Sequence, residues 1–150
     1  LRLPESVHVF FIGDGIQKNE VVEMAHSLGV EHRTHFMGIR SDVPAILKAA
    51  DIVVMSSHYE GFGLAAVEGM AASKPVIASD VDGLREVVAG AGITFTPGDA
   101  NDLADKIKSL INDYVLYQAT AEKCFKRAQQ FDISQMTNGY LSVYKELLTP

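Results

Sequence analysis

Two acidic side chains, Glu60 and Glu68, lie on either side of a Gly-Phe-Gly sequence in the small and apolar stretch "SSHYEGFGLAAVEGMAASKPVIAS", residues 56–79. Gly61 and Gly63 can adopt backbone angles closed to other residues, so consecutive N–H groups can turn toward an anion where the next helix begins. A phosphate is suited to that position. A helix that begins near Gly63 places Glu68 about one and a half turns inside it, among small residues that let another group approach.

The carboxylate of Glu68 needs hydrogen-bond donors if a ligand covers it, because an unpaired charge is costly to remove from water. The two hydroxyls of a ribose could donate those bonds, and Glu60 could reach a sugar hydroxyl in the same way. The spacing alone leaves a second interpretation open. In that interpretation both acids are exposed near a helix start, where the helix dipole favours negative charge.

Short β-type runs alternate with helical segments along the chain, which is typical of a parallel sheet with helices packed on it. The predicted strands are residues 7–13, 33–38, 51–57, 75–79 and 92–96, and the predicted helices lie in residues 14–29, 41–50, from about 63, 82–90 and from about 98 to the chain end. Asp99 or Asn101 can cap the first C-terminal helix. We therefore predict an α/β, Rossmann-like three-layer sandwich with a mainly parallel sheet and C-terminal helices, the last of them (140–148) folded against this domain or a neighbouring one.

Ligands of open parallel sheets bind outside the carboxyl ends of the strands, so the loops after the strands are candidate sites. The first, "GDG" at residues 13–15, is half of a dinucleotide-binding fingerprint, and Lys18 stands where its third glycine is expected. A tight strand-to-helix turn is an equal interpretation of it. In the second loop Gly38 frees the backbone to approach a flat ligand and Arg40 could reach a phosphate, although alone this loop resembles an ordinary turn. The third is the stretch with the two acids.

Composition excludes several functional classes. The 150 residues suggest one domain, and the formal net charge of -6 disfavours a nucleic-acid surface. Cys124 is the single cysteine, which excludes an internal disulfide and favours a reducing, cytoplasmic compartment. No apolar run approaches the roughly 20 residues that span a bilayer, so we predict a soluble protein. The five histidines form no ligand cluster by spacing and no metal site is predicted, but His58 precedes Glu60 in the candidate loop.

The stretch 56–79 resembles the signature of retaining glycosyltransferases of the GT-B fold, in the group 1 family that is also known as family 4. There a strand leads to E-G-F-G, a second Glu follows after seven intervening residues, and a Pro-Val strand comes next; Glu60 and Glu68 match that pattern. The segments "FIGDG", "HFMG", "DIVVMSS", "DGLREVV", "GITFTPGDANDLADKI" and "YLSVYKELL" resemble the family in order and spacing. The likeness covers nearly the whole chain.

The resemblance implies a nucleotide-sugar donor, a UDP- or GDP-sugar, with Glu68 on the ribose and Glu60 as the catalytic residue near the donor sugar's hydroxyls. It implies further donor contacts from the backbone of Gly61, Phe62, Gly63 and Leu64, and from Met37, Gly38, Ile39 and Arg40 near the base. Gly15, in the GDG turn, and His58, just before Glu60, are further candidate contacts because of their positions. Transfer in the family retains the anomeric configuration and uses no tightly bound cofactor. N–H groups and basic side chains would stabilise the departing nucleotide diphosphate.

Three residues depart from the family pattern near the expected donor pocket. Asp82 stands where a second glycine usually precedes Gly83, Ser73 replaces a common glycine, and Gly69 replaces a usual alanine. Asp82 could alter which anionic or hydroxyl groups fit the pocket.

A GT-B enzyme has two Rossmann-like domains, and this chain resembles only the C-terminal one. We expect residues 1–150 to be a donor-binding domain truncated at its N-terminus, without the N-terminal acceptor domain and without a first strand and helix that carry an Arg and a Lys for the diphosphate. The full-length protein is then expected to be a hexosyltransferase of glycan biosynthesis. It would act on an acceptor glycan or lipid-linked sugar, in the cytoplasm or peripherally at the cytoplasmic face of a membrane, and the isolated chain is expected to be inactive.

Three other functions remain open at this point. A glycoside hydrolase also uses paired carboxylates, about 5 to 10 Å apart across a sugar, with one acid in an apolar pocket. A non-catalytic α/β binding or assembly module is consistent with the short length and the apolar C-terminal helices. Nucleotide-sugar epimerases share the GT-B architecture, but the E-G-F-G segment with its second acid matches the transferases better.

Overall fold

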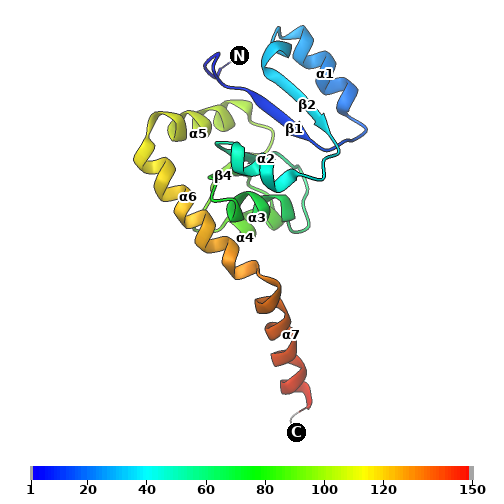
Figure 1. Ribbon diagram of the computed structural model, residues 1–150, viewed down its shortest axis with the longest axis vertical. Helices are drawn as coiled ribbons and strands as arrows, with labels where there is room; N and C mark the ends of the chain where they lie inside the picture. Colours follow the sequence, from blue (N-terminus) through cyan, green and yellow to red (C-terminus); the bar gives the residue numbers. More distant parts are fainter. Residues whose placement is uncertain (1, 149–150) are drawn as a thin grey trace. The chain divides into compact units, whose positions relative to one another are not determined.

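The computed structural model describes residues 2–148, which divide into two compact units (Figure 1). The N-terminal unit ends at Ile46 and the C-terminal unit begins at Leu47. The boundary falls inside helix α2 (Val43–Ala49).

The N-terminal unit holds a two-stranded parallel sheet. Its elements are β1 (Val9–Ile12), α1 (Lys18–Ser27), the 3-10 turn η1 (Glu31–Arg33) and β2 (Thr34–Gly38). Val9 pairs with Thr34, and Ile12 pairs with Gly38 after a shift in register. Because the N–H of Gly13 donates to the carbonyl of Gly38 at 2.8 Å, the loops that follow the two strands are joined.

The C-terminal unit holds a three-stranded parallel sheet with β4 at its centre. Its elements are β3 (Val53–Met55), α3 (Leu64–Ala71), β4 (Val76–Ser79), α4 (Asp82–Val88), β5 (Ile93–Phe95), α5 (Ala100–Asn112), α6 (Tyr114–Ala128), the 3-10 turn η2 (Gln129–Phe131) and α7 (Ile133–Leu148). The predicted strands and helices are thus all present.

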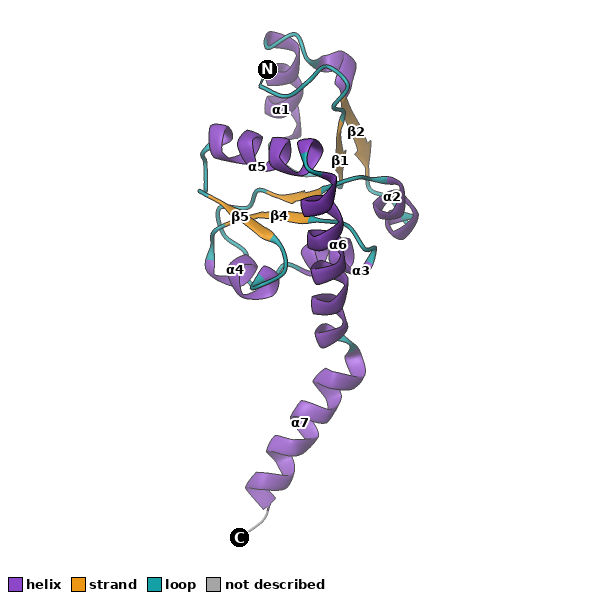
Figure 2. Cartoon of the chain, turned by 90° about the vertical axis from the view of Figure 1, so that its left-hand side faces the viewer, coloured by secondary structure: helices purple, strands orange, loops and turns teal. Residues whose placement is uncertain are grey.

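Side chains alternate along β4 and face two separate cores. Val76 and Ala78 pack in one core with residues of α3, α4 and α6, whereas Ile77 packs with Leu110 of α5 on the other face. Figure 2 shows α5 and α4 on opposite faces of this sheet. Since every residue of β4 is buried, the strand has the pattern of a central parallel strand. The three-layer α/β prediction is confirmed.

The five strands form two sheets rather than the one sheet that was predicted. Within residues 2–148, β1 pairs with β2 alone and β3 pairs with β4 alone. The apolar residues of β1 are correspondingly open, with Phe10 53% exposed. Parallel strands are normally covered on both faces, so the apolar side chains of β1 are more exposed than is usual for such a strand.

The C-terminal helices begin at acidic caps. Asp99, not Asn101, caps α5, because its side chain accepts hydrogen bonds from the N–H groups of Asn101 and Asp102. Asp113 accepts one from the N–H of Leu116 at the start of α6. Each bond satisfies an N–H that the helix itself leaves unpaired.

Helix α7 has an apolar stripe but no buried residue. Tyr140, Val143, Tyr144 and Leu147 are all at least half exposed, and Figure 1 shows the helix continuing beyond α6 and η2. Among the described residues, no helix has the length and apolar character needed to cross a bilayer.

Candidate functional site

The loops that follow β3, β4 and β5 come together at one edge of the C-terminal sheet. The Ser79 hydroxyl at the end of β4 donates to the carbonyl of Ser57, which ties down the loop after β3. The His58 ring lies near Gly98 in the loop after β5, at 3.7 Å from the position of an added Cβ. The stretch with the two acids therefore occupies the edge where ligands of parallel sheets bind.

Two positions around the turn that follows Glu60 have room for glycine only, one in the turn itself and one in α4. Gly63 has a φ of +89°, and a Cβ there would lie 2.6 Å from Cδ2 of Leu84 in α4. At Gly83, in the first turn of α4, a Cβ would lie 2.3 Å from the Glu60 carbonyl oxygen. The start of α4 thus packs directly on the backbone of residues 60–63, which we call the donor loop.

The start of α3 presents unused N–H groups at the same edge. The N–H of Gly61 donates to Oε1 of Glu60 at 3.2 Å. Within residues 2–148, the N–H groups of residues 62–65 have no acceptor, and the first backbone bonds of the helix run from Ala66 and Val67 to the carbonyl of Gly63. Successive free N–H groups at a helix start, aided by the helix dipole, suit a phosphate.

The two acids differ in their surroundings. Glu60 is half-buried and bonds only to its own loop, whereas Glu68 is exposed on α3 and its carboxylate has no partner among the described residues. Next to Glu68, α3 packs so closely on β3 that a Cβ on Gly69 would lie 2.9 Å from Val53. The carboxylate of Glu68 is therefore on the open side of the helix and available to a ligand.

The side chain of Phe62 packs within the protein, whereas the predicted donor contact concerned its backbone. Its ring packs edge-on against Phe131 of η2, with 5.4 Å between ring centroids and an interplanar angle of 83°. Phe131 in turn packs against the core formed with α3 and α4. The ring of Phe62, although 44% exposed, therefore links the donor loop to η2, and the backbone is the part that the loop can offer to a ligand.

The predicted contacts to a base lie in the N-terminal unit. Arg40 is paired with Asp42 through two bonds, Nε to Oδ1 at 2.8 Å and Nη2 to Oδ2 at 2.7 Å. This pairing raises the pKa of Arg40 and lowers that of Asp42. Ile39 is 85% exposed, and the N–H of Gly15 donates to Asp14. Arg40 must therefore release or share Asp42 to bind a phosphate, and the roles of Gly15, Met37, Gly38, Ile39 and Arg40 stay predictions.

Asp82 was singled out from the sequence, but its ion-pair partner, Arg85, was not. Arg85 bonds through Nη1 to Asp82 at 3.0 Å and through Nε to Asp80, so two carboxylates beside the donor loop share one guanidinium. These bonds raise the pKa of Arg85, with the bond to Asp80 the largest cause. The i,i+3 spacing of Asp82 and Arg85 was the available signal. The charge that Asp82 adds to the family pattern is thus offset only in part, because Asp80 shares the same guanidinium.

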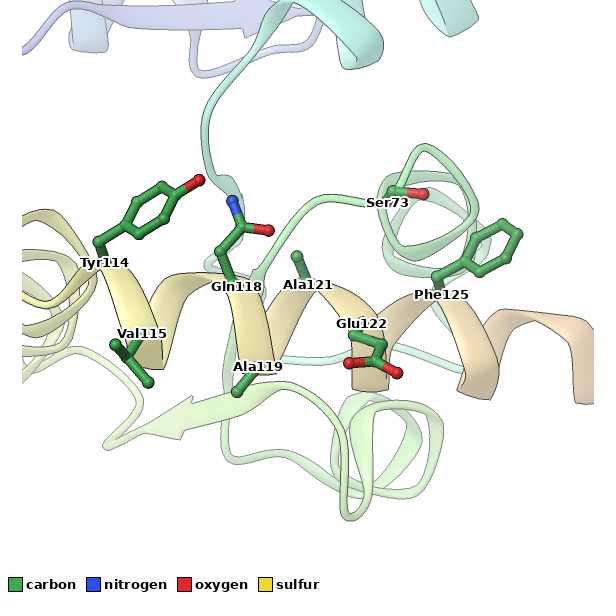
Figure 3. A pocket seen from close by; sticks show the side chains of 8 residues that line it. All are labelled: Ser73, Tyr114, Val115, Gln118, Ala119, Ala121, Glu122 and Phe125. Atoms are coloured by element: carbon green, nitrogen blue, oxygen red, sulfur yellow. The ribbon is translucent and has the colours of Figure 1, made fainter.

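A hollow of about 650 Å³ lies elsewhere in the C-terminal unit, between the end of α3 and α6. Figure 3 shows Tyr114, Gln118 and Phe125 projecting from the side of α6 on which Ser73 lies. None of the predicted donor residues lines this hollow. The hollow is therefore separate from the candidate site.

Residues 2–131 match the sequence profile of the family described as glycosyl transferases group 1. The chain belongs to this family. Its relatives include an uncharacterized glycosyltransferase of Methanocaldococcus jannaschii, 34% identical over 91% of this chain and 40% of that protein. A glycogen synthase of Mycobacterium tuberculosis is 32% identical over 88% of this chain and 33% of that protein.

Solved structures agree with this membership. The Anabaena protein HepE in complex with UDP-glucose has a TM-score of 0.89 at 30% identity, over 97% of this chain and 42% of HepE. A glycosyltransferase from Rickettsia africae has a TM-score of 0.86 at 26% identity, over 96% of this chain and 41% of that protein. The chain thus spans about two fifths of the length of these relatives.

Proposed function

We propose that this chain is the donor-binding domain of a retaining glycosyltransferase of family 4, and that its donor is a UDP-sugar. The observation that carries the proposal is the row of free N–H groups at the start of α3, with the open carboxylate of Glu68 four residues further along the same helix. The similarity to HepE, which was solved with UDP and with UDP-glucose, supports uracil as the base.

The residues of the site have separate roles in this proposal. The diphosphate lies against the N–H groups of residues 62–65, and the ribose hydroxyls donate to Glu68. When the bond between the sugar and the diphosphate breaks, negative charge develops on the departing diphosphate, and the fixed N–H groups stabilise it without rearrangement. Glu60 accepts from a hydroxyl of the donor sugar and orients the anomeric carbon. From the family resemblance we also expect donor contacts from Met37, Gly38, Ile39 and Arg40, and from Gly15 and His58.

The whole protein's reaction extends the proposal. We infer transfer of a hexose to a glycan or lipid-linked acceptor held by an N-terminal acceptor domain, in the cytoplasm or at the cytoplasmic face of a membrane. Since the chain spans about two fifths of its relatives, we expect residues 1–150 alone to bind donor without transferring sugar.

Calorimetric titration with UDP, GDP and ADP tests the proposal. We expect UDP to bind, and Glu68→Ala to weaken it by about tenfold or more, because a bond to a charged acceptor is lost. Glu86→Ala, which removes an equal charge from the exposed face of α4, is the matched control and should bind UDP as the parent chain does. Equal losses in both variants would contradict the role of Glu68. Failure of all three nucleotides to bind would favour a non-catalytic binding or assembly module.

A further inference from the structure

The donor loop contains two glycines, so something outside it must hold its shape. Phe62 is the one residue between Gly61 and Gly63, and its side chain is the only one in that turn that can pack. Glycine-flanked turns have many accessible conformations. The position of the N–H groups that follow therefore depends on what the Phe62 ring contacts.

That contact is Phe131, 69 positions along the chain. The two rings meet edge to face, with centroids 5.4 Å apart. This arrangement places the positive edge of one aromatic ring on the negative face of the other and is favoured over a parallel sandwich. Phe131 is partly buried and packs against the core that includes Ala66 and Met70 of α3.

Phe131 is itself fixed by Arg127. The Arg127 guanidinium lies over the Phe131 ring, 4.8 Å from its centroid. The same guanidinium donates through Nε to the carbonyl of Val87 at 3.1 Å and through Nη2 to the carbonyl of Glu86 at 2.7 Å. Since these are carbonyls of the last turn of α4, Arg127 joins the end of α6 to the end of α4.

The other end of helix α4 contacts the donor loop itself. Gly83, in its first turn, approaches the Glu60 carbonyl so closely that no side chain fits between them. The donor loop is therefore held twice, by the start of α4 on its backbone and by Phe131 on its one packed side chain. Both supports are connected through α4.

We propose that Phe131 is a positioning residue for the donor site. Through its edge-to-face contact with Phe62, it fixes the donor loop so that the N–H groups of residues 62–65 converge on one ligand. What the loop binds rests on the proposed function, whereas the coupling between the two rings does not. Phe131 makes no contact with the ligand in this arrangement.

A double-mutant cycle with Phe62→Leu and Phe131→Leu tests the coupling. Leucine keeps apolar bulk but removes the ring. The first measurement is amide hydrogen exchange of Ala66 and Val67, whose N–H groups bond to the carbonyl of Gly63 at 2.9 and 3.3 Å. The second is the Kd for UDP. Phe125→Leu is the matched control, since Phe125 is another partly exposed aromatic of the C-terminal helices and, within residues 2–148, its ring stacks on neither Phe62 nor Phe131.

We expect Phe131→Leu to raise both exchange rates and to weaken UDP binding by about threefold to tenfold, the range of an aromatic pair. In the Phe62→Leu background the same change should add nothing, and Phe131→Tyr should behave as the parent chain does. Additive effects, or equal effects from Phe125→Leu, would overturn the proposal. If the parent chain bound no nucleotide, the proposed function would fail, but the exchange cycle would still decide the coupling.

Discussion

Glu68 and Gly83 contribute to the candidate site in different ways, one through its side chain and the other through the absence of one. The Glu68 side chain is exposed and packs against little, so its removal should change ligand binding more than the fold. Gly83 offers no side chain at all, and its value is the space it leaves for the Glu60 carbonyl. The spacing of the two acids pointed to the first kind of residue. The second kind becomes visible only when α4 and the donor loop are placed side by side.

Gly83→Ala should disturb the donor loop. The new Cβ would lie 2.3 Å from the Glu60 oxygen and 2.8 Å from the Gly61 oxygen, so the loop must move. We expect a loss of about 1 to 3 kcal/mol in the free energy of unfolding, as for other overpacked sites, together with weaker UDP binding. Denaturant unfolding and calorimetry measure the two effects.

Gly139→Ala is the control for that substitution. Gly139 lies in α7 with nothing within 4 Å of the added Cβ, so the change should leave stability unchanged or slightly raised. An unaltered stability and an unaltered UDP Kd in Gly83→Ala would show that the close approach of α4 does not shape the loop.

At the scale of elements, α3 ends in an arrangement that usually contains glycine. Ser73 follows the helix with a φ of +60°, its N–H donates to the carbonyl of Met70, and the N–H of Lys74 donates to the carbonyl of Gly69. This is the Schellman pattern, in which the left-handed position favours glycine. The family's common glycine at this position thus has a physical reason, and Ser73 departs from it at a cost in strain.

Ser73→Gly should therefore stabilise the chain. Relief of the left-handed strain is partly offset by the freedom that glycine has in the unfolded chain, so we expect a gain of about 0.5 to 1 kcal/mol. That gain corresponds to a rise in Tm of about 1 to 4 °C, which scanning calorimetry can resolve. A lower Tm would mean that the serine hydroxyl contributes more than its backbone strain costs.

The start of α5 should make stability depend on pH. Oδ2 of Asp102 accepts from the N–H of Thr96 at 2.7 Å and from its hydroxyl at 3.0 Å, which lowers the pKa of Asp102. A lowered folded-state pKa contributes stability above the unfolded pKa of about 3.9, and that contribution is lost as pH falls through the folded value. Asp102→Asn should thus be less stable at pH 7, with the difference shrinking below about pH 4.

Thermal unfolding between pH 7 and pH 2 checks this dependence. Asp105→Asn is the matched control, because Asp105 lies on the same helix and only faces Lys108 at the surface. A difference between the parent chain and Asp102→Asn that stays constant across this range would exclude the carboxylate bonds as its source.

Local sequence patterns predicted the strands and helices well, but they did not predict the contacts between residues far apart in the chain. Alternating β-type and helical runs located every strand, and the cap at Asp99 was one of two candidates. The contact of Phe62 with Phe131 and the bonds of Arg127 to α4 join residues 40 or more positions apart. No periodicity encodes such pairs. The division into two sheets was also missed, because strand sequences show which residues are apolar and tend to be buried, but not which strands are neighbours.

At the scale of the whole molecule, α7 stands apart from the folded core of the C-terminal unit. It has no buried residue, whereas η2 before it carries Phe131 against the core. Ending the chain after Asp132 should therefore lower the free energy of unfolding by less than about 1 kcal/mol, because little apolar area becomes exposed. Ending it after Ala128 removes Phe131 and should cost clearly more. Thermal unfolding of the two shortened chains compares them, and a large loss on ending the chain after Asp132 would show that α7 packs on the core in solution.

The most direct test of the account is to map UDP-glucose on the chain by the amide NMR shifts of each residue. We predict the largest shifts at residues 61–65 and at Glu68, around the start of α3, with little change at Tyr114 or Phe125 beside the hollow on α6. Shifts confined to that hollow, or an unchanged donor loop at saturating UDP-glucose, would contradict the claim that the start of α3 holds the nucleotide sugar.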